Sequence, residues 1–410
     1  MKFGLIGEKL SHSYSKIIHN LLGVDYELFE VENGGLDNFI NNLNLKGFNV
    51  TIPYKQDIMK YLDYISEEAS AVNAVNTVLE KDGKLYGHNT DVLGFIYMLK
   101  RKRISLKDKC VMVLGSGGAS KSAVYVAQKQ GAKSVTVVGR TLNYNYQNFY
   151  ELQDTQVIIN TTPVGMYPNY DGEIVDLKKF KNLIAVFDFI YNPLKTNIIK
   201  QAEELNLISS NGISMLVEQA LSAEDIWFDT THPHFETELA IGEIIKRSLN
   251  VTLVGMPGSG KSTIGKELAK ALNKEFFDLD EEIFNEYNKS PADIIKESGE
   301  EYFREIETKV LKKTLLASNR VVALGGGAII KEENRNFLKY NSISVYVERD
   351  LDKLSLDNRP LSLANGVEKL YNERKAYYES ANVKVKNDKE IIKTVKEIKS
   401  IYETACIKWS

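Results

Sequence analysis

The fold of the C-terminal part is decided by the stretch Val251-Thr252-Leu253-Val254-Gly255-Met256-Pro257-Gly258-Ser259-Gly260-Lys261-Ser262. Four strand-forming residues precede a loop that matches G-x-x-x-x-G-K-[ST], and helical spacing follows to about Leu272. In such a loop, backbone N–H groups surround phosphates, and the next helix adds its positive dipole end. The pattern predicts a nucleoside triphosphate site with Mg²⁺ on Ser262. The residues expected to bind the nucleotide are Gly258, Ser259, Gly260, Lys261, Ser262 and Thr263.

A second glycine loop, Gly115-Ser116-Gly117-Gly118-Ala119, lies between a strand-like run at 111–114 and a helix-like run at 121–129. Both loops are typical of the first βα unit of an α/β sheet, and one sheet rarely needs two such starts. The fold class expected is therefore α/β, with a boundary near 248–250.

The organisation along the chain predicts residues 1–248 as one enzyme and 249–410 as a second, with a P-loop NTPase-type fold. Strand-like runs at 2–7 and 47–52 and helix-like runs at 16–22 and 36–43 indicate a small α/β substrate domain at about 1–93. Helical stretches within 213–247 are expected to return to it. Residues 94–212 would form a Rossmann-like dinucleotide domain. Residues 388–402 have the spacing of a packed amphipathic helix rather than a membrane-surface helix.

Composition excludes several classes of protein. The 410 residues are 43% hydrophobic and 26% charged, with a formal net charge of −3, so nucleic-acid binding is not expected. No window approaches the roughly 18 apolar residues of a membrane span, and the N-terminus has no signal-peptide pattern. Two cysteines cannot form a disulfide framework. We expect a cytoplasmic protein that binds no membrane, and its oligomeric state, monomer or homodimer, is not decidable from sequence.

Polar residues that follow the second loop indicate what the kinase-type domain acts on. Residues 276–280 are predicted to form the adjacent strand, which would direct Asp278 and Asp280 to one face. Such carboxylates can hold a metal ion through water and accept a proton from a hydroxyl. Arg304, Arg359 and Arg374 supply guanidinium groups suited to carboxylates and phosphates. A further strand at 321–324 leads into Gly325-Gly326-Gly327.

Together these motifs resemble shikimate kinase over nearly all of 250–385. The resemblance implies that shikimate is held by Asp280, Arg304, Gly326 and Arg374, with both arginines on its carboxylate and Asp280 as catalytic base. It also implies that Arg359, on a lid, covers the ATP phosphates and that Asp278 supports Mg²⁺ through water. This sequence departs from the family in a lid with few basic residues besides Arg359.

In the first part, Arg140 and Thr141 follow a strand-like run at 135–138. An arginine at this place favours the 2′-phosphate of NADP, although a plain surface arginine is the alternative. The NADP-binding residues expected are Gly115, Ser116, Gly117, Gly118, Ala119, Arg140 and Thr141. Only 20 positions separate Arg140 from Asn160, so this sheet is expected to lack one βα unit.

Further motifs of the first part carry the chemistry of ketone reduction. They are Ser11-His12-Ser13-Tyr14-Ser15, Asn49 to Lys55, Ala74-Val75-Asn76-Thr77, Gly87 to Asp91, Asp188 to Pro193 and Asn211 to Ala220. Reduction needs a proton donor beside the carbonyl oxygen, and a lysine oriented by an aspartate can provide it. By itself, a Lys–Asp pair is more often a surface salt bridge.

This ordered set resembles shikimate dehydrogenase over about 1–245. The resemblance implies that Lys55 and Asp91 form the catalytic dyad. It further implies substrate contacts from Ser13, Ser15, Thr51, Asn76, Asp91, Tyr191 and Gln219, and places Gly212 and Met215 against the nicotinamide of NADP.

Both parts converge on one metabolite, which predicts a bifunctional enzyme that reduces 3-dehydroshikimate with NADPH and phosphorylates shikimate with MgATP. These would be consecutive steps towards chorismate and aromatic amino acids. The alternatives are a quinate/shikimate oxidoreductase fused to another small-molecule kinase, or an inactive nucleotide-sensing protein. Intact Lys55, Asp91, Lys261 and Asp280 argue against an inactive protein.

Overall fold

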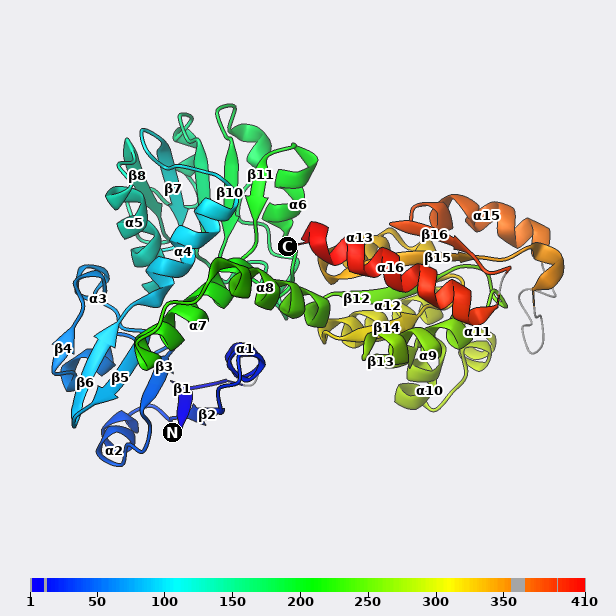
Figure 1. Cartoon of the computed structure of the whole chain (residues 1–410). Helices are drawn as coiled ribbons and strands as arrows, with labels where there is room; N and C mark the ends of the chain where they lie inside the picture. The colour runs from blue at the N-terminus through cyan, green and yellow to red at the C-terminus, as the bar shows by residue number, and fades with distance from the viewer. Residues whose placement is uncertain (1, 11–12, 355–365, 389, 410) are drawn as a thin grey trace. The chain divides into compact units, whose positions relative to one another are not determined.

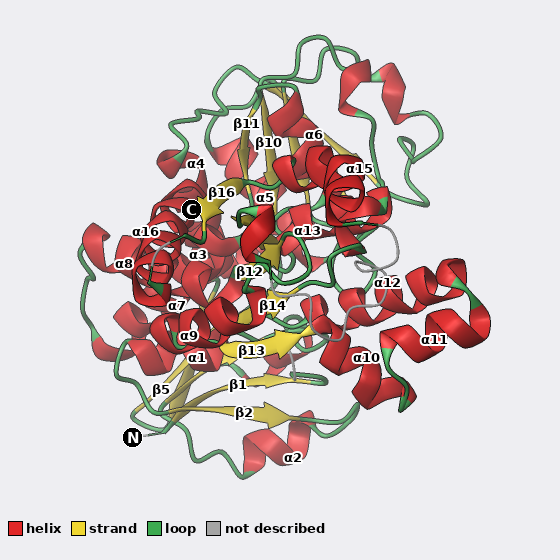
Figure 2. Ribbon diagram, turned by 90° about the vertical axis from the view of Figure 1, so that its right-hand side faces the viewer, coloured by secondary structure: helices red, strands yellow, loops and turns green. Residues whose placement is uncertain are grey.

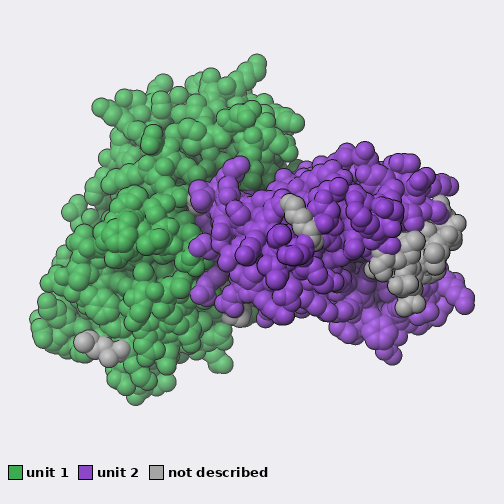
Figure 3. Space-filling model, turned by 45° about the vertical axis from the view of Figure 1, so that its right-hand side comes forward, with its two compact units in different colours: residues 1–191, 195–244 green, residues 192–194, 245–410 purple. Residues whose placement is uncertain are grey.

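The computed structural model describes residues 2–10, 13–354, 366–388 and 390–409. The chain forms two compact units, residues 1–191 with 195–244 and residues 192–194 with 245–410 (Figure 3, green and purple). The predicted division at 248/249 stays a prediction.

The first sheet of unit 1 has six strands in the order β2-β1-β3-β5-β6-β4. β1 pairs in parallel with β2 and β3, whereas β5 runs antiparallel to β3 and β6. Its strands are β1 (Phe3–Gly7), β2 (Tyr26–Glu30), β3 (Gly47–Val50), β4 (Tyr64–Ile65), β5 (Thr77–Lys81) and β6 (Lys84–His88). The accompanying helices are α1 (Ser15–Leu21), α2 (Leu36–Asn41), the 3₁₀ helix η1 (Asp57–Tyr61) and α3 (Glu67–Val72). β3 is shorter than predicted, because the chain turns at Thr51 before Pro53, which has no N–H for a ladder.

The second sheet of unit 1 has five parallel strands in the order β11-β10-β9-β7-β8, as expected for a dinucleotide fold. Its strands are β7 (Cys110–Leu114), β8 (Ser134–Val138), β9 (Val157–Asn160), β10 (Ala185–Asp188) and β11 (Ile208–Ser210). Its helices are α4 (Thr90–Arg101), α5 (Gly118–Lys129), η2 (Phe149–Glu151), η3 (Leu177–Lys179) and α6 (Asn197–Glu204). Residues 139–156 hold η2 and no strand, so β8 is an edge strand, as the short spacing predicted.

Two helices follow, α7 (Ile213–Phe228) and α8 (His234–Ser248). α7 packs on α4 and returns to the first sheet (Figure 1), where Trp227 donates from Nε1 to the carbonyl of Val78 at 3.0 Å. The Trp227 ring also stacks on Phe3, with centroids 5.0 Å apart. α7 therefore links the first sheet to the helix that begins with Thr90 and Asp91.

The sheet of unit 2 has five parallel strands in the order β13-β14-β12-β15-β16. The strands are β12 (Asn250–Val254), β13 (Glu275–Asp278), β14 (Arg320–Ala323), β15 (Ser342–Glu348) and β16 (Val383–Lys386). Helices pack around this sheet (Figure 2, helices red and strands yellow). They are α9 (Lys261–Leu272), α10 (Leu279–Tyr287), α11 (Pro291–Ser298), α12 (Glu300–Leu316), η4 (Ala328–Ile330), α13 (Glu332–Asn341), η5 (Leu351–Lys353), α15 (Val367–Glu379) and α16 (Ile391–Trp409).

Two sequence predictions for unit 2 were wrong. β13 is not adjacent to the P-loop strand β12, because β14 pairs with both and lies between them. Asp280 is not on a strand, because Asp278 caps α10 by accepting from the N–H of Asp280 at 3.1 Å, and the helix begins at Leu279.

The end helix α16 matches its prediction as a packed amphipathic helix. Val395, Ile398 and Tyr402 are buried on one face, and the helix packs against α9. Among the described residues, no helix is both long and apolar enough to cross a bilayer.

Candidate functional site

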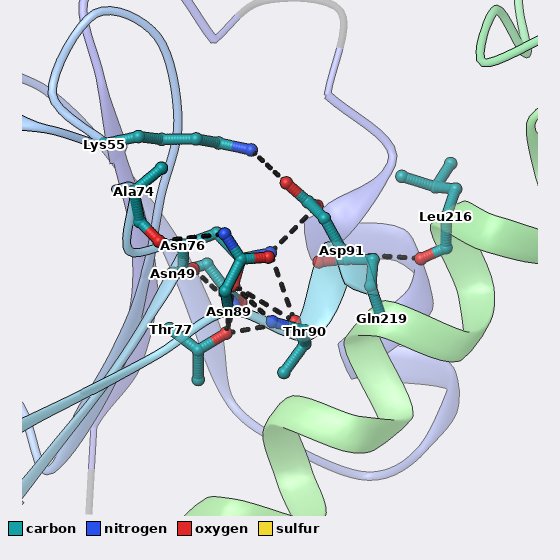
Figure 4. Close-up of polar contacts among 10 residues, drawn as sticks. All are labelled: Asn49, Lys55, Ala74, Asn76, Thr77, Asn89, Thr90, Asp91, Leu216 and Gln219. Atoms are coloured by element: carbon teal, nitrogen blue, oxygen red, sulfur yellow. Dashed lines mark hydrogen bonds and ion pairs between the residues drawn. The ribbon is translucent and has the colours of Figure 1, made fainter. Parts of the chain in front are cut away.

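A lysine, an aspartate and an asparagine from three segments of unit 1 meet in a network of hydrogen bonds (Figure 4). Lys55 lies in the turn after β3, Asn76 precedes β5 and Asp91 is in the first turn of α4. Lys55 donates from Nζ to Oδ2 of Asp91 at 2.7 Å, and Asn76 donates from Nδ2 to Oδ1 at 2.9 Å. The carboxylate is thus held at both oxygens, while the Lys55 side chain remains 24% exposed. An ammonium oriented in this way can deliver a proton to a molecule bound beside it.

Buried amides hold this arrangement in place. Asn76 accepts at Oδ1 from the N–H of Thr90 at 2.7 Å, which fixes its amide orientation towards α4. Asn49 donates from Nδ2 to the Asn76 carbonyl at 3.2 Å and accepts from the Tyr26 hydroxyl at 2.7 Å. Asn49 belongs to a motif noted in the sequence, but no role was predicted for it. The feature of the sequence that could have indicated a role for Asn49 is its polar side chain within an otherwise apolar strand.

Gln219 is brought towards Asp91 by the contact of α7 with α4. A Cβ on Gly94 would lie 2.6 Å from the Met215 carbonyl oxygen and 3.3 Å from Cβ of Gln219, so only glycine allows this approach. Gln219 itself donates from Nε2 to the carbonyl of Leu216 at 2.9 Å. The importance of Gly94 was missed, because a single glycine in a helical pattern does not reveal which helix it contacts.

The remaining predicted substrate residues lie on three other segments of unit 1. Ser13 accepts at Oγ from the N–H of Ser15 at 3.2 Å, and Ser15 is buried. Thr51 lies at the end of β3, where its Cγ2 would be 2.5 Å from a Cβ on Gly7. The Tyr191 ring meets Tyr14 edge-on, with centroids 5.6 Å apart, and burial raises the pKa of Tyr191 to about 12.

The first glycine loop leaves room for a ligand at the start of α5. Gly115 has φ +105° and packs against Thr161, whose Oγ1 would lie 2.8 Å from a Cβ. A Cβ on Gly117 or Gly118 would meet nothing within 4 Å. This open cradle of backbone at a helix N-terminus fits a pyrophosphate group. The adjoining predicted residues are Ser116, whose Oγ lies near Gly139, and Ala119 in the first turn of α5.

Arg140 and Thr141 follow the edge strand β8 after one residue, Gly139, and both are exposed. The positive charge of Arg140 acts on Tyr146, whose pKa is nevertheless raised by burial. An exposed guanidinium at the end of the second strand fits a ribose 2′-phosphate.

A buried carboxyl group connects the ends of β9 and β10. Asp188 accepts from Asn160 Nδ2 at 3.0 Å, from the N–H of Ile190 at 3.0 Å and from Thr196 Oγ1 at 2.5 Å. Burial raises the pKa of Asp188 to about 7, and these hydrogen bonds oppose that shift. Gly212 packs on the following loop, because a Cβ there would lie 2.2 Å from the Phe189 carbonyl oxygen. The loop that carries Tyr191 and the start of α7, which carries Met215, are therefore held together.

In unit 2, the P-loop turns sharply around the start of α9. Gly258 has φ +83° and Gly260 has φ +94°, which only glycine adopts without strain. Lys261 donates from Nζ to the carbonyls of Gly255 and Met256, each at 2.9 Å. Ser262 donates to Oδ2 of Asp278 at 2.5 Å, which places a hydroxyl and a carboxylate together as oxygen donors for a hard cation.

Arg304 lies at the run Gly325-Gly326-Gly327, with both ends of its guanidinium occupied. It donates from Nη1 to Oε2 of Glu307 at 2.7 Å and from Nη2 to Oε1 of Glu300 at 2.9 Å. A Cβ on Gly327 would lie 2.3 Å from Nη2, so glycine is required for the guanidinium to lie flat there. Burial raises the pKa of Glu307 to about 7 against the attraction of Arg304. Glu307 was quoted in the sequence motif but not predicted as part of the site.

The other predicted kinase residues gather at the same glycines. A Cβ on Gly325 would lie 2.9 Å from Oδ1 of Asp280. A Cβ on Gly326 would lie 2.7 Å from Cδ of Pro257, so this run touches the P-loop. Arg374 is buried and interacts electrostatically with Glu307. Arg359 lies outside the described residues.

Comparisons with known proteins agree with this geometry. The shikimate dehydrogenase substrate-binding domain model matches residues 5–78, and the shikimate kinase model matches residues 257–403. Shikimate dehydrogenase (NADP(+)) of Clostridium beijerinckii is 43% identical over 245 residues, which cover 55% of this chain and 91% of the relative.

Two solved structures are also similar. A chorismate mutase/shikimate 5-dehydrogenase fusion protein from Clostridium acetobutylicum is 36% identical with a TM-score of 0.57, over 59% of this chain and 96% of that chain. Shikimate 5-dehydrogenase from Thermus thermophilus, solved with NADP(H) and shikimate, is 27% identical with a TM-score of 0.54, over 59% of this chain and 99% of that chain. These similarities confirm the α/β fold class, both resemblances and the two enzyme activities that they imply, with NADP as the cofactor of the dehydrogenase.

Proposed function

Because this chain belongs to the shikimate dehydrogenase family and carries a shikimate kinase domain, we propose that it catalyses two consecutive reactions on one metabolite. The first reduces 3-dehydroshikimate to shikimate, and the second phosphorylates shikimate to shikimate 3-phosphate. The single observation that supports this proposal most is the presence of both sites in one chain, the Lys55–Asp91 pair and the complete P-loop with Arg304.

In the reductase, the Lys55 ammonium donates a proton to the carbonyl oxygen of the substrate. Asp91 orients that ammonium through the hydrogen bond that Lys55 donates from Nζ to Oδ2 at 2.7 Å. NADPH, when bound, supplies the hydride. Substrate contacts come from Ser13, Ser15, Thr51, Asn76, Tyr191 and Gln219.

The cofactor is held by the loop from Gly115 to Ala119 and by the side chains that follow β8. The open space at Gly117 and Gly118 admits the pyrophosphate, and Arg140 with Thr141 holds the 2′-phosphate. Gly212, which packs on Phe189, and Met215, in the first turn of α7, lie against the nicotinamide.

In the kinase, Arg304 and Arg374 bind the shikimate carboxylate, and the backbone of Gly326 borders the ring. Asp280 accepts the proton of the attacking 3-hydroxyl. The P-loop residues Gly258 to Thr263 surround the phosphates of ATP, and Arg359 covers them. Ser262 and, through water, Asp278 hold Mg²⁺, for which their adjacent oxygens are suited. Mg²⁺, when bound, offsets the charge of the β- and γ-phosphates.

A coupled assay tests the proposal. The full chain is incubated with NADPH, ATP, Mg²⁺ and 3-dehydroshikimate, and NADP⁺, ADP and shikimate 3-phosphate are expected in equal amounts. Quinate and dehydroquinate in place of the shikimate compounds test the competing oxidoreductase specificity. If a folded chain forms neither NADP⁺ nor shikimate 3-phosphate, the proposal is contradicted and a nucleotide sensor is favoured. The expected cytoplasmic location stays a prediction.

A further inference from the structure

Arg349 lies beside the P-loop, at a position where the sequence analysis predicted no ligand contact. It directly follows β15, which pairs with the P-loop strand β12 in parallel. The carboxyl ends of parallel neighbours meet at one edge of a sheet, which is where such folds bind nucleotides. A Cβ on Gly260 would lie 3.9 Å from Nη1 of Arg349, so the guanidinium borders the loop.

This guanidinium has no protein partner within the described parts of the chain. Its Nε is buried there without a hydrogen-bond acceptor. The acids on either side in sequence are already paired with lysines. Glu348 binds Lys384 at 2.7 Å, while Asp350 binds Lys353 at 2.9 Å and Lys386 at 3.1 Å. Since native proteins rarely leave a buried donor unsatisfied, such a group points to a ligand.

A second polar side chain fixes the loop next to Arg349. Asn387, which follows β16, donates from Nδ2 to the carbonyl of Ser259 at 2.7 Å. Its own N–H donates to the carbonyl of Glu348 at 2.7 Å. These two bonds connect the end of β15 to the P-loop, so the backbone that carries Arg349 is held beside the loop.

We propose that Arg349 is a nucleotide-binding residue of the kinase, and that its guanidinium contacts the phosphates of ATP that remain in ADP. The inference rests on the proposed binding of ATP in the P-loop. Backbone groups of such a loop surround the α- and β-phosphates, and Gly260 is part of that surface. A free guanidinium at this place forms charge-assisted bonds with phosphate oxygens. The contact exists before and after transfer, so it contributes to binding rather than to turnover.

The test uses the full chain with Arg349→Ala and measures the Kd of ADP, the KM of ATP and kcat. We expect the Kd of ADP and the KM of ATP to rise about 10-fold, while kcat and the KM of shikimate change less than about twofold. The Kd of AMP should rise less than that of ADP if the β-phosphate makes the contact. Arg349→Lys keeps the charge without the planar fork, and it should recover part of the affinity.

Lys384→Ala is the matched control, because it removes a neighbouring cation that is already paired with Glu348. Equal losses in Arg349→Ala and Lys384→Ala would overturn the inference in favour of a general charge effect. Unchanged ADP binding in Arg349→Ala would overturn it directly. If Arg349→Ala does not fold, Arg349→Lys and Arg349→Gln provide the same comparison. A folded wild-type chain that binds neither ATP nor ADP would instead contradict the proposed kinase function.

Discussion

Lys55 Nζ and Asp91 Oδ2 lie 2.7 Å apart, although 36 positions separate the two residues in sequence. The turn after β3 supplies the lysine, and the first turn of α4 supplies the aspartate. Asn76 donates to the other carboxylate oxygen of Asp91 at 2.9 Å. The aspartate is thus held at both oxygens, and it orients the ammonium of Lys55.

Removal of the lysine should abolish most reduction. Lys55→Ala is expected to lower kcat for 3-dehydroshikimate reduction by roughly 10²–10⁴, because a general acid usually contributes that much. Steady-state NADPH oxidation measures it, and kinase turnover in the same preparation should be unchanged. Lys46→Ala is a control, since this lysine pairs with Glu80 at the surface. Full reductase activity in Lys55→Ala would remove Lys55 from the catalytic role.

Removal of the P-loop lysine should abolish the kinase activity and leave the reduction unchanged. Lys261→Ala is expected to abolish phosphorylation of shikimate, because the lysine of a loop of this type is the one that reaches the β- and γ-phosphates. Production of ADP and NADP⁺ in separate assays checks this. An equal loss of reduction in a folded variant would indicate a coupling between the two activities that the proposal does not contain.

Arg304→Ala and Arg374→Ala should each raise the KM of shikimate strongly and the KM of ATP little. Charge-assisted hydrogen bonds of this kind contribute about 1.5–3 kcal/mol each, so a rise of about 10- to 150-fold is expected. Lys289→Ala, which breaks an exposed pair with Glu297, should leave both constants unchanged. A variant with a defect in ATP alone would place its arginine on the nucleotide instead.

The dehydrogenase should prefer NADPH over NADH through Arg140. One charge-assisted contact of about 1.5–3 kcal/mol corresponds to a ratio of kcat/KM on the order of 10 to 150. Leu142 and Asn143, which follow, add no second positive charge. Arg140→Ala should bring the two cofactors close to parity. Wild-type preference for NADH, or a variant that keeps its NADPH preference, would refute the role of Arg140.

Unit 1 should lose stability as the pH rises towards 9, because of His232. Its hydrogen bond to Glu218, together with a second to Asp225, raises the pKa of His232 to about 9 against the opposing effect of burial. The unfolded chain has a histidine pKa of about 6.5. The stabilisation is therefore fully present below about pH 6.5 and is lost as the pH rises through about 9, with a total of about 1–3 kcal/mol.

The two tryptophans allow this loss to be assigned to unit 1, since Trp227 lies in α7 and Trp409 in α16. In a Trp409→Phe background, the fluorescence of Trp227 reports urea unfolding of unit 1 between pH 6 and pH 9.5. Adding His232→Gln should flatten the pH dependence over this range. If the double variant keeps the full slope, another group causes it.

Local motifs allowed much of the site to be predicted from sequence. The P-loop, the first glycine loop and the segments with Lys55 and Asp91 each encode their own geometry, because short-range hydrogen bonds and glycine dihedrals depend on neighbours in the chain. The amphipathic end helix and the missing βα unit after β8 were predicted for the same reason. The assignment of roles to individual residues stays a prediction.

What the sequence by itself determined was the class of fold, the two nucleotide-binding loops and the residue types that carry the chemistry. Only the tertiary structure decided that β14 separates β13 from β12, that Asp278 starts a helix, and that Asn49, Glu307 and Arg349 adjoin the sites. These relationships depend on strand order and on contacts between residues far apart in sequence. One such contact is that of α4 with α7, where the absence of a side chain at Gly94 leaves room for Met215. A pattern of neighbouring residues does not indicate which distant residues will be in contact. Those contacts depend on packing and strand register, which are fixed only when the whole chain has folded.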